Sequence, residues 1–161
     1  MHGNVIGGDP GTNGGVAVID PLGKVLYVAG FRPDITIPEF RDVCREAAKV
    51  AGPDAFGWVE KVGYMGPRPD NPKGDGGKGS FTFGRGYGWL EMGLCSHDVT
   101  VKHVAPMIWQ ARLECLTGGN KNVSKRRALD LFGAQVPKIT HSIADALLIA
   151  EYGRVMAGLV R

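Results

Sequence analysis

The 161-residue sequence lacks the features of membrane-spanning and secreted proteins. It has no run of about 18 apolar residues, the length that a membrane helix needs, and no basic stretch followed by an apolar core at its start. It has only three cysteines, and their odd number and wide spacing fit neither a disulfide framework nor a zinc site. We therefore expect a cytoplasmic protein with reduced thiols and no membrane partner, which forms a single domain over residues 1–161.

Charge and glycine are distributed unevenly along the chain. Residues 1–60 hold five Lys and Arg against eight Asp and Glu, whereas residues 61–161 hold fourteen against eight. The 25 glycines are about twice the average share of roughly 7%, and they concentrate in residues 3–15 and 63–93. A basic region that follows an acidic one is a weak indication of a polyanion held beside a carboxylate site.

The spacing of apolar residues predicts an α/β fold. Residues 5–9, 15–19 and 24–29 have the pattern of strands joined by tight turns, as in an antiparallel meander. The rest of the chain alternates helices and strands around one long loop, residues 62–79. These elements are helices over 38–50, 80–96, 105–116, 123–133 and 141–158 and strands over 55–60 and 99–104. We expect a mixed five-stranded sheet with helices on both faces.

Three carboxylates occupy unusual positions for solvated side chains. Asp9 ends the first strand, Glu60 ends the fourth, and Asp145 lies among alanine and leucine residues of the last helix. Each alone has a structural explanation, because Asp9 could accept N–H groups of its own turn, Glu60 could pair with a lysine, and Asp145 could belong to a buried ion pair. Together they lie on elements that a mixed sheet can bring to one edge.

Carboxylates that converge repel one another unless a cation lies between them. Oxygen ligands favour Mg²⁺ or Mn²⁺ over softer metals. One or two such ions held by carboxylates beside a basic surface are typical of phosphoryl-transfer enzymes. The glycines after Asp9 would then let a nucleic-acid backbone approach the ions closely.

Four motifs in the sequence resemble the RuvC-type Holliday junction resolvases, in the phage-like branch of the RNase H-like superfamily. They are GGDPGTNGG at 7–15, WVEKV at 58–62, NKNVSKRRALDLFG at 120–133 and HSIADALLIAEYG at 141–153. The resemblance covers nearly the whole chain and implies an RNase H-like fold. It also implies a metal-dependent homodimer that nicks opposing strands of a four-way DNA junction symmetrically, leaving 5′-phosphates. A phage protein of this kind would act in the cytoplasm of the host cell.

The resemblance extends to the metal ligands, with one departure. Asp9, Glu60 and Asp145 match three ligands of the family, which commonly has a further aspartate three or four residues before the last one. Those positions are Ser142 and His141 here. Residues four apart share one helix face, so His141 can reach the cation that Asp145 binds, and we expect it to be the fourth ligand. Alternatively, His141 only lies at a helix start that Ser142 or Thr140 caps.

The same resemblance points to DNA-contacting residues. Lys125 matches a lysine near the scissile phosphate, which makes it a candidate catalytic residue, although it could simply lie on a solvated helix end. Tyr64 is a candidate for a wedge that unstacks the junction centre, or it could close its loop on the core. The remaining basic residues with a predicted DNA-binding role are Arg68, Lys73, Lys78, Lys121, Arg126 and Arg127.

The glycines within the predicted helix 80–96 disfavour a helix, which favours close approach of a second subunit there as compensation. Other functions remain open at this point: a debranching or flap nuclease of broader specificity, and a non-catalytic junction-binding module. An actin-like ATPase is disfavoured because it needs at least twice this length. A P-loop is excluded because GDGGKGS at 74–80 does not match its pattern.

Overall fold

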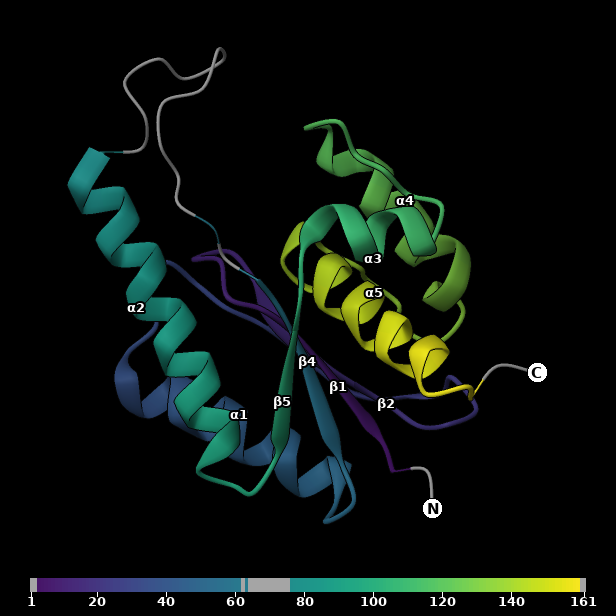
Figure 1. Ribbon diagram of the computed structural model, residues 1–161, viewed down its shortest axis with the longest axis horizontal. Helices are drawn as coiled ribbons and strands as arrows, with labels where there is room; N and C mark the ends of the chain where they lie inside the picture. The colour runs from purple at the N-terminus through teal and green to yellow at the C-terminus, as the bar shows by residue number, and fades with distance from the viewer. Residues whose placement is uncertain (1–2, 62, 64–75, 160–161) are drawn as a thin grey trace.

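The computed structural model describes residues 3–61, 63 and 76–159 and has one mixed sheet in this part of the chain (Figure 1). Its strands are β1 (Val5–Asp9), β2 (Gly15–Ile19), β3 (Val25–Gly30), β4 (Phe56–Glu60) and β5 (Thr100–Val104), in the order β3-β2-β1-β4-β5. The first three strands are antiparallel neighbours, while β4 runs parallel to both β1 and β5. The predicted five-stranded mixed sheet is confirmed.

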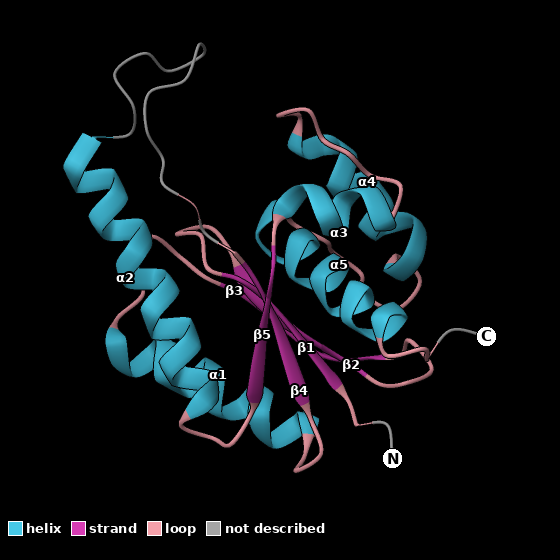
Figure 2. Cartoon of the chain, in the orientation of Figure 1, coloured by secondary structure: helices cyan, strands magenta, loops and turns pink. Residues whose placement is uncertain are grey.

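Helices cover both faces of the sheet, as predicted (Figure 2). They are α1 (Ile37–Ala51), α2 (Gly76–Cys95), α3 (Pro106–Arg112), α4 (Lys121–Phe132) and α5 (His141–Met156). One buried cluster joins α1 and α2 to one face, and a second joins α3, α4 and α5 to the other. The helix predicted over 105–116 ends at Arg112, because the backbone leaves the helical conformation and Glu114 has a positive φ of 58°. Within the described residues, no helix combines the length and apolar character of a membrane span.

Two adjacent glycines in β1 bring a helix close to each face of the central strand. A Cβ at Gly7 would overlap the backbone of Ala146 and Ala150 in α5. A Cβ at Gly8 would lie 2.9 Å from the Leu90 side chain of α2, on the opposite face. The close contact at Gly7 places the first half of α5 beside the carboxyl end of β1. It therefore determines that Asp145 and Asp9 lie near each other.

Candidate active site

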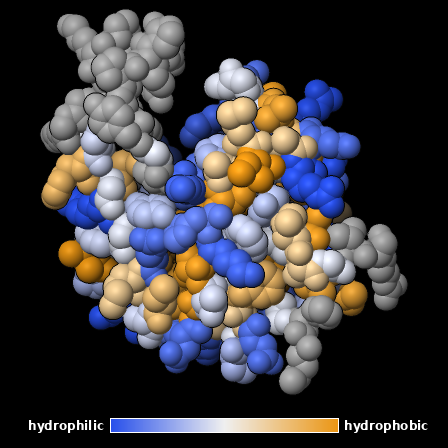
Figure 3. All heavy atoms as spheres, in the orientation of Figure 1, coloured by the Kyte–Doolittle hydropathy of each residue, from blue (hydrophilic) through white to orange (hydrophobic). Residues whose placement is uncertain are grey.

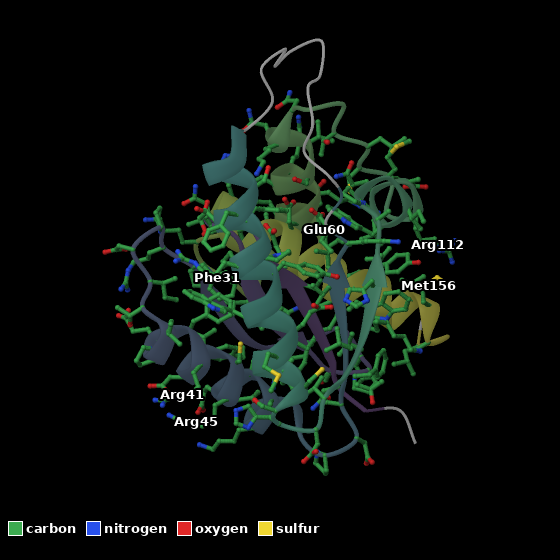
Figure 4. All side chains as sticks on the ribbon, turned by 60° about the vertical axis from the view of Figure 1, so that its left-hand side comes forward. Phe31, Arg41, Arg45, Glu60, Arg112 and Met156 are labelled. Carbon is green, nitrogen blue, oxygen red and sulfur yellow. The ribbon has the colours of Figure 1, made fainter. Side chains whose placement is uncertain are left out.

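A pocket of about 340 Å³ lies at the edge of the sheet where β1 and β4 end. Its walls include Asp9 of β1, Glu60 of β4 and Asp145 of α5. Phe83 of α2 and Gln110 of α3 line it as well, so it lies between the two helical layers. Figure 4 shows Glu60 in this position, near the centre of the molecule and between α2 and α3. The structure thus brings together the three carboxylates that the sequence singles out.

Asp9 is held by its own turn and still lines the pocket. The backbone N–H of Gly11 donates to Asp9 Oδ1 over 3.0 Å, which is the structural role that aspartate often has before glycine. A Cβ at Gly14 would overlap the backbone of Asp9, so the tight turn itself requires this glycine. Burial raises the pKa of Asp9 from 3.8 to about 6, and the charge of Asp145 adds to this shift.

Glu60 is held from the other side of the pocket. The indole N–H of Trp109, in α3, donates to Glu60 Oε2 over 3.0 Å. Burial raises the pKa of Glu60 from 4.5 to about 7, and the neighbouring charge of Asp9 is the second cause. The indole N–H lowers the pKa in part, because it stabilises the carboxylate form.

Asp145 has a buried oxygen for which the described part of the chain offers no hydrogen-bond partner. Among the described residues, nothing forms a hydrogen bond with the buried Oδ1 of this side chain. Burial raises the pKa of Asp145, whereas the hydroxyl of Ser124 and the charges of Lys121 and His141 oppose the rise. A buried carboxylate oxygen without a partner is costly, and a bound cation would satisfy it.

Lys121 is the lysine that the structure places at the carboxylates. It is the first residue of α4, it lines the pocket, and its charge lowers the pKa values of Asp9, Glu60 and Asp145. Lys125, the predicted catalytic lysine, lies one turn further along α4. It is not among the described residues that line the pocket.

The side chains of His141 and Ser142 differ in their contacts and in their exposure. Ser142 Oγ shares a hydrogen bond of 2.7 Å with Thr140 Oγ1 and lies against Gly30 at the end of β3. His141 is exposed, one helical turn before Asp145, and its charge acts on that carboxyl group. Thr140 is the N-cap of α5 but makes no capping hydrogen bond with its side chain. Like Lys125, His141 is not among the described residues that line the pocket.

The predicted DNA-binding residues fall into three groups. Arg126 is exposed on α4. Arg127 donates from Nε to the carbonyl of Leu113 over 2.9 Å, so it also holds the segment between α3 and α4. Tyr64, Arg68 and Lys73 lie outside the described residues, and Lys78 lies in α2 with its side chain outside them.

The donor atoms of the pocket fit a hard divalent cation. They are carboxylate oxygens, one of them buried without a partner, and their raised pKa values reflect burial together with mutual repulsion. Among the described residues, however, no three His, Cys, Asp or Glu side chains are close enough to form a complete cage. A complete cage of protein side chains is not required of every cation site, because Mg²⁺ in proteins usually keeps several water ligands and binds through one or two carboxylates and substrate phosphates.

Structural comparison identifies the fold, whereas no protein-family model and no curated protein sequence matches the chain. The structure of Thermus thermophilus RuvC in complex with a Holliday junction substrate is similar with a TM-score of 0.70 and 19% identity, over 98% of this chain and 96% of that chain. A second Thermus thermophilus RuvC structure has a TM-score of 0.68 and 18% identity, over 97% and 96%. The chain therefore has the RNase H-like fold of RuvC, and the resemblance seen in the motifs is confirmed at the level of the fold.

Several residues around the pocket carry no signal in the sequence. Trp109 and Phe83 look like ordinary core aromatics, and Ser124 looks like a polar residue on a solvated helix. Thr117 orients the side-chain amide of Gln110, because its backbone N–H and its hydroxyl both donate to Gln110 Oε1. The NH₂ group of this amide therefore faces away from Thr117. Only the contacts between elements reveal these roles.

Proposed function

We propose that this protein is a metal-dependent, structure-selective DNA endonuclease. It resolves four-way junctions by paired symmetric nicks that leave 5′-phosphates, as in DNA recombination and repair. The observation that carries the proposal is the convergence of Asp9, Glu60 and Asp145, with Lys121, on one pocket of a RuvC-like fold. The similar structure that includes a Holliday junction supports the choice of branched DNA as the substrate. A single nuclease domain over residues 1–161 and a cytoplasmic setting, in a host cell if a phage encodes it, belong to the same proposal.

The side chains of the pocket have separate tasks in this reaction. Bound by the carboxylates and His141, one or two Mg²⁺ or Mn²⁺ ions would supply an activated water and stabilise the departing oxygen. Asp145 offers its buried Oδ1, which has no hydrogen-bond partner among the described residues, while Gly11 and Trp109 hold Asp9 and Glu60 in place. Lys121 places a positive charge on the side of the pocket that the scissile phosphate would face.

The proposal includes a homodimer formed through α2. Phe81 and Met92 expose 70% and 68% of their surface, and Gly84 and Gly88 have open space where a side chain would be. These residues recur at helical spacing and form an apolar face that a second copy of the helix could approach closely. Hydrophobic side chains also gather over α3 in Figure 3, where Met107 and Ile108 are exposed.

Cleavage of labelled branched DNA tests this function. The protein is incubated with a four-way junction, a flap and a linear duplex, with Mg²⁺ or Mn²⁺. Paired symmetric nicks in the junction with little cutting of the duplex are the expected result. Cutting of the flap at an equal rate would indicate the broader debranching nuclease, and binding without cleavage would indicate a junction-binding module. A cruciform plasmid adds a test of the dimer, since two coordinated active sites give linear product directly.

A pair of lysine variants on α4 distinguishes catalysis from DNA anchoring. We expect Lys121→Ala to lower the cleavage rate about 100-fold, with junction affinity reduced only a few-fold, because its charge lies at the pocket. Lys125→Ala, the matched control, should lower affinity and cleavage together and only a few-fold. Single-turnover cleavage and gel-shift titrations measure both effects. The reverse pattern would support the catalytic role predicted for Lys125.

An imidazole ligand at position 141, where the resembling family has an aspartate, should change the preference of the site for metals. If His141 is a ligand, cleavage in Mn²⁺ will be at least as fast as in Mg²⁺, because imidazole binds Mn²⁺ more readily. His141→Asp should shift the ratio of the two rates toward Mg²⁺, whereas Ser142→Ala should leave it unchanged. Initial rates at matched metal concentrations measure the ratio. Clearly slower cleavage by the parent protein in Mn²⁺ would contradict ligation by His141.

A further inference from the structure

We propose that Trp109 is a positioning residue that holds Glu60 in the orientation needed to bind a divalent cation. This inference rests on the proposed function, in which Glu60 is a metal ligand. Nothing in the motifs points to Trp109. It follows from one hydrogen bond, from the indole Nε1 to Glu60 Oε2 over 3.0 Å, made by a side chain that is 0% exposed.

The contact is a direct consequence of the strand order. Glu60 ends β4 opposite Val104, which ends β5, and the N–H of Lys61 donates to the carbonyl of Val104 over 2.7 Å. The chain then turns into α3 at Pro106, so the first turn of this helix lies beside the end of β4. The inward-facing residue of that turn is Trp109, and its indole N–H points at the carboxylate.

An indole N–H suits this task better than most hydrogen-bonding groups. It donates and never accepts, so it fixes a carboxylate oxygen but cannot compete for the cation. Held at Oε2, Glu60 loses rotamer freedom before the ion arrives, and its carboxylate still lines the pocket. Hydrogen-bond partners that orient a metal ligand in this way contribute about 10–100-fold to metal affinity in known sites.

Trp109 also packs in the core with residues of α4 and α5, so deletion of the whole ring would confuse two effects. The test therefore replaces only the N–H. Benzothienylalanine, in which sulfur replaces the indole nitrogen, is introduced at position 109 by amber suppression in the full chain. The control is the same replacement at Trp89, whose ring contacts Arg85 on α2 and lines a different pocket.

Calorimetric titration with Mn²⁺, without DNA, measures the affinity of each protein, and thermal unfolding in EDTA reports on the core. We expect the Kd for Mn²⁺ to rise about 10-fold with the analogue at position 109 and to stay unchanged with the analogue at position 89. In a Glu60→Gln background, the analogue at position 109 should have no further effect on the Kd.

The outcomes separate the two proposals. An unchanged Kd at position 109, in a protein that binds Mn²⁺ normally, would overturn the positioning role and leave the proposed function intact. A rise in Kd of the same size in the Glu60→Gln background would overturn it too, because the effect would not pass through Glu60. If the parent protein binds no divalent cation and cuts no junction, the proposed function fails first and the inference fails with it.

Discussion

Asp145→Asn is expected to lower the rate of junction cleavage at least about 1,000-fold while leaving junction affinity within a few-fold of the parent protein. The substitution keeps the size of the side chain but removes the charge that pairs with a cation. A metal ion contributes several kcal/mol to the stabilisation of the transition state, and about 4 kcal/mol corresponds to the expected change in rate. Single-turnover cleavage at saturating protein measures the rate separately from affinity.

Asp130→Asn is the matched control for this variant, because Asp130 is an exposed aspartate on α4 and is not among the described residues that line the pocket. It should cleave at the parent rate. If Asp145→Asn retained even a tenth of the parent activity, the buried oxygen without a partner would not be a metal ligand. The nuclease proposal would then have no carboxylate metal ligand from α5.

The sheet and its helices could be predicted from the sequence because each element is encoded locally. Glu39 and Thr36 form a capping box that starts α1, and the turns after Asp9 and Asp20 contain the glycines and prolines that tight turns need. Local patterns say less about where an element ends. The early end of α3 depends on a positive φ at Glu114, for which glutamate carries no sequence signal.

The candidate site was only partly predictable, for a different reason. An acid among apolar residues is visible in a sequence, so Asp9, Glu60 and Asp145 stand out. Lys121 is predicted only as a DNA-binding residue and Trp109 is not predicted at all, because lysines on helices and tryptophans in cores are ordinary. Their roles depend on contacts between residues far apart in the chain: Lys121 begins α4, which packs against α5, and Trp109 reaches Glu60 because β4 pairs with β5.

The second large effect concerns stability without metal. We expect the free energy of unfolding, measured in EDTA, to fall as the pH rises from about 4 to 7. Asp9 and Glu60 have pKa values raised from 3.8 to about 6 and from 4.5 to about 7. Over this range the folded state keeps protons that the unfolded state releases, and such a difference lowers stability with increasing pH. A shift of about two pH units corresponds to roughly 3 kcal/mol for one carboxyl group.

The effects of the two acids do not simply add, because the charge of Asp9 contributes to the raised pKa of Glu60 and the two groups titrate together. Glu39 acts in the opposite direction but at lower pH. Hydrogen bonds with Thr36 lower its pKa to about 2, so the stability it contributes is lost as the pH falls below about 4.5. The pH range between 5 and 7 therefore reports on the pocket.

Urea denaturation at several pH values in EDTA, and again with saturating Mn²⁺, measures both parts of this prediction. A cation that binds only the folded protein adds stability by mass action, and it should add most above pH 7, where the carboxylates are ionised. Asp9→Asn and Glu60→Gln should each reduce the slope in EDTA and weaken the gain with Mn²⁺, whereas Asp130→Asn should do neither. Stability that is constant or rises over this range in EDTA would mean that the pocket does not raise the pKa values of these carboxyl groups by burial and repulsion, and the case for a shared cation would be lost.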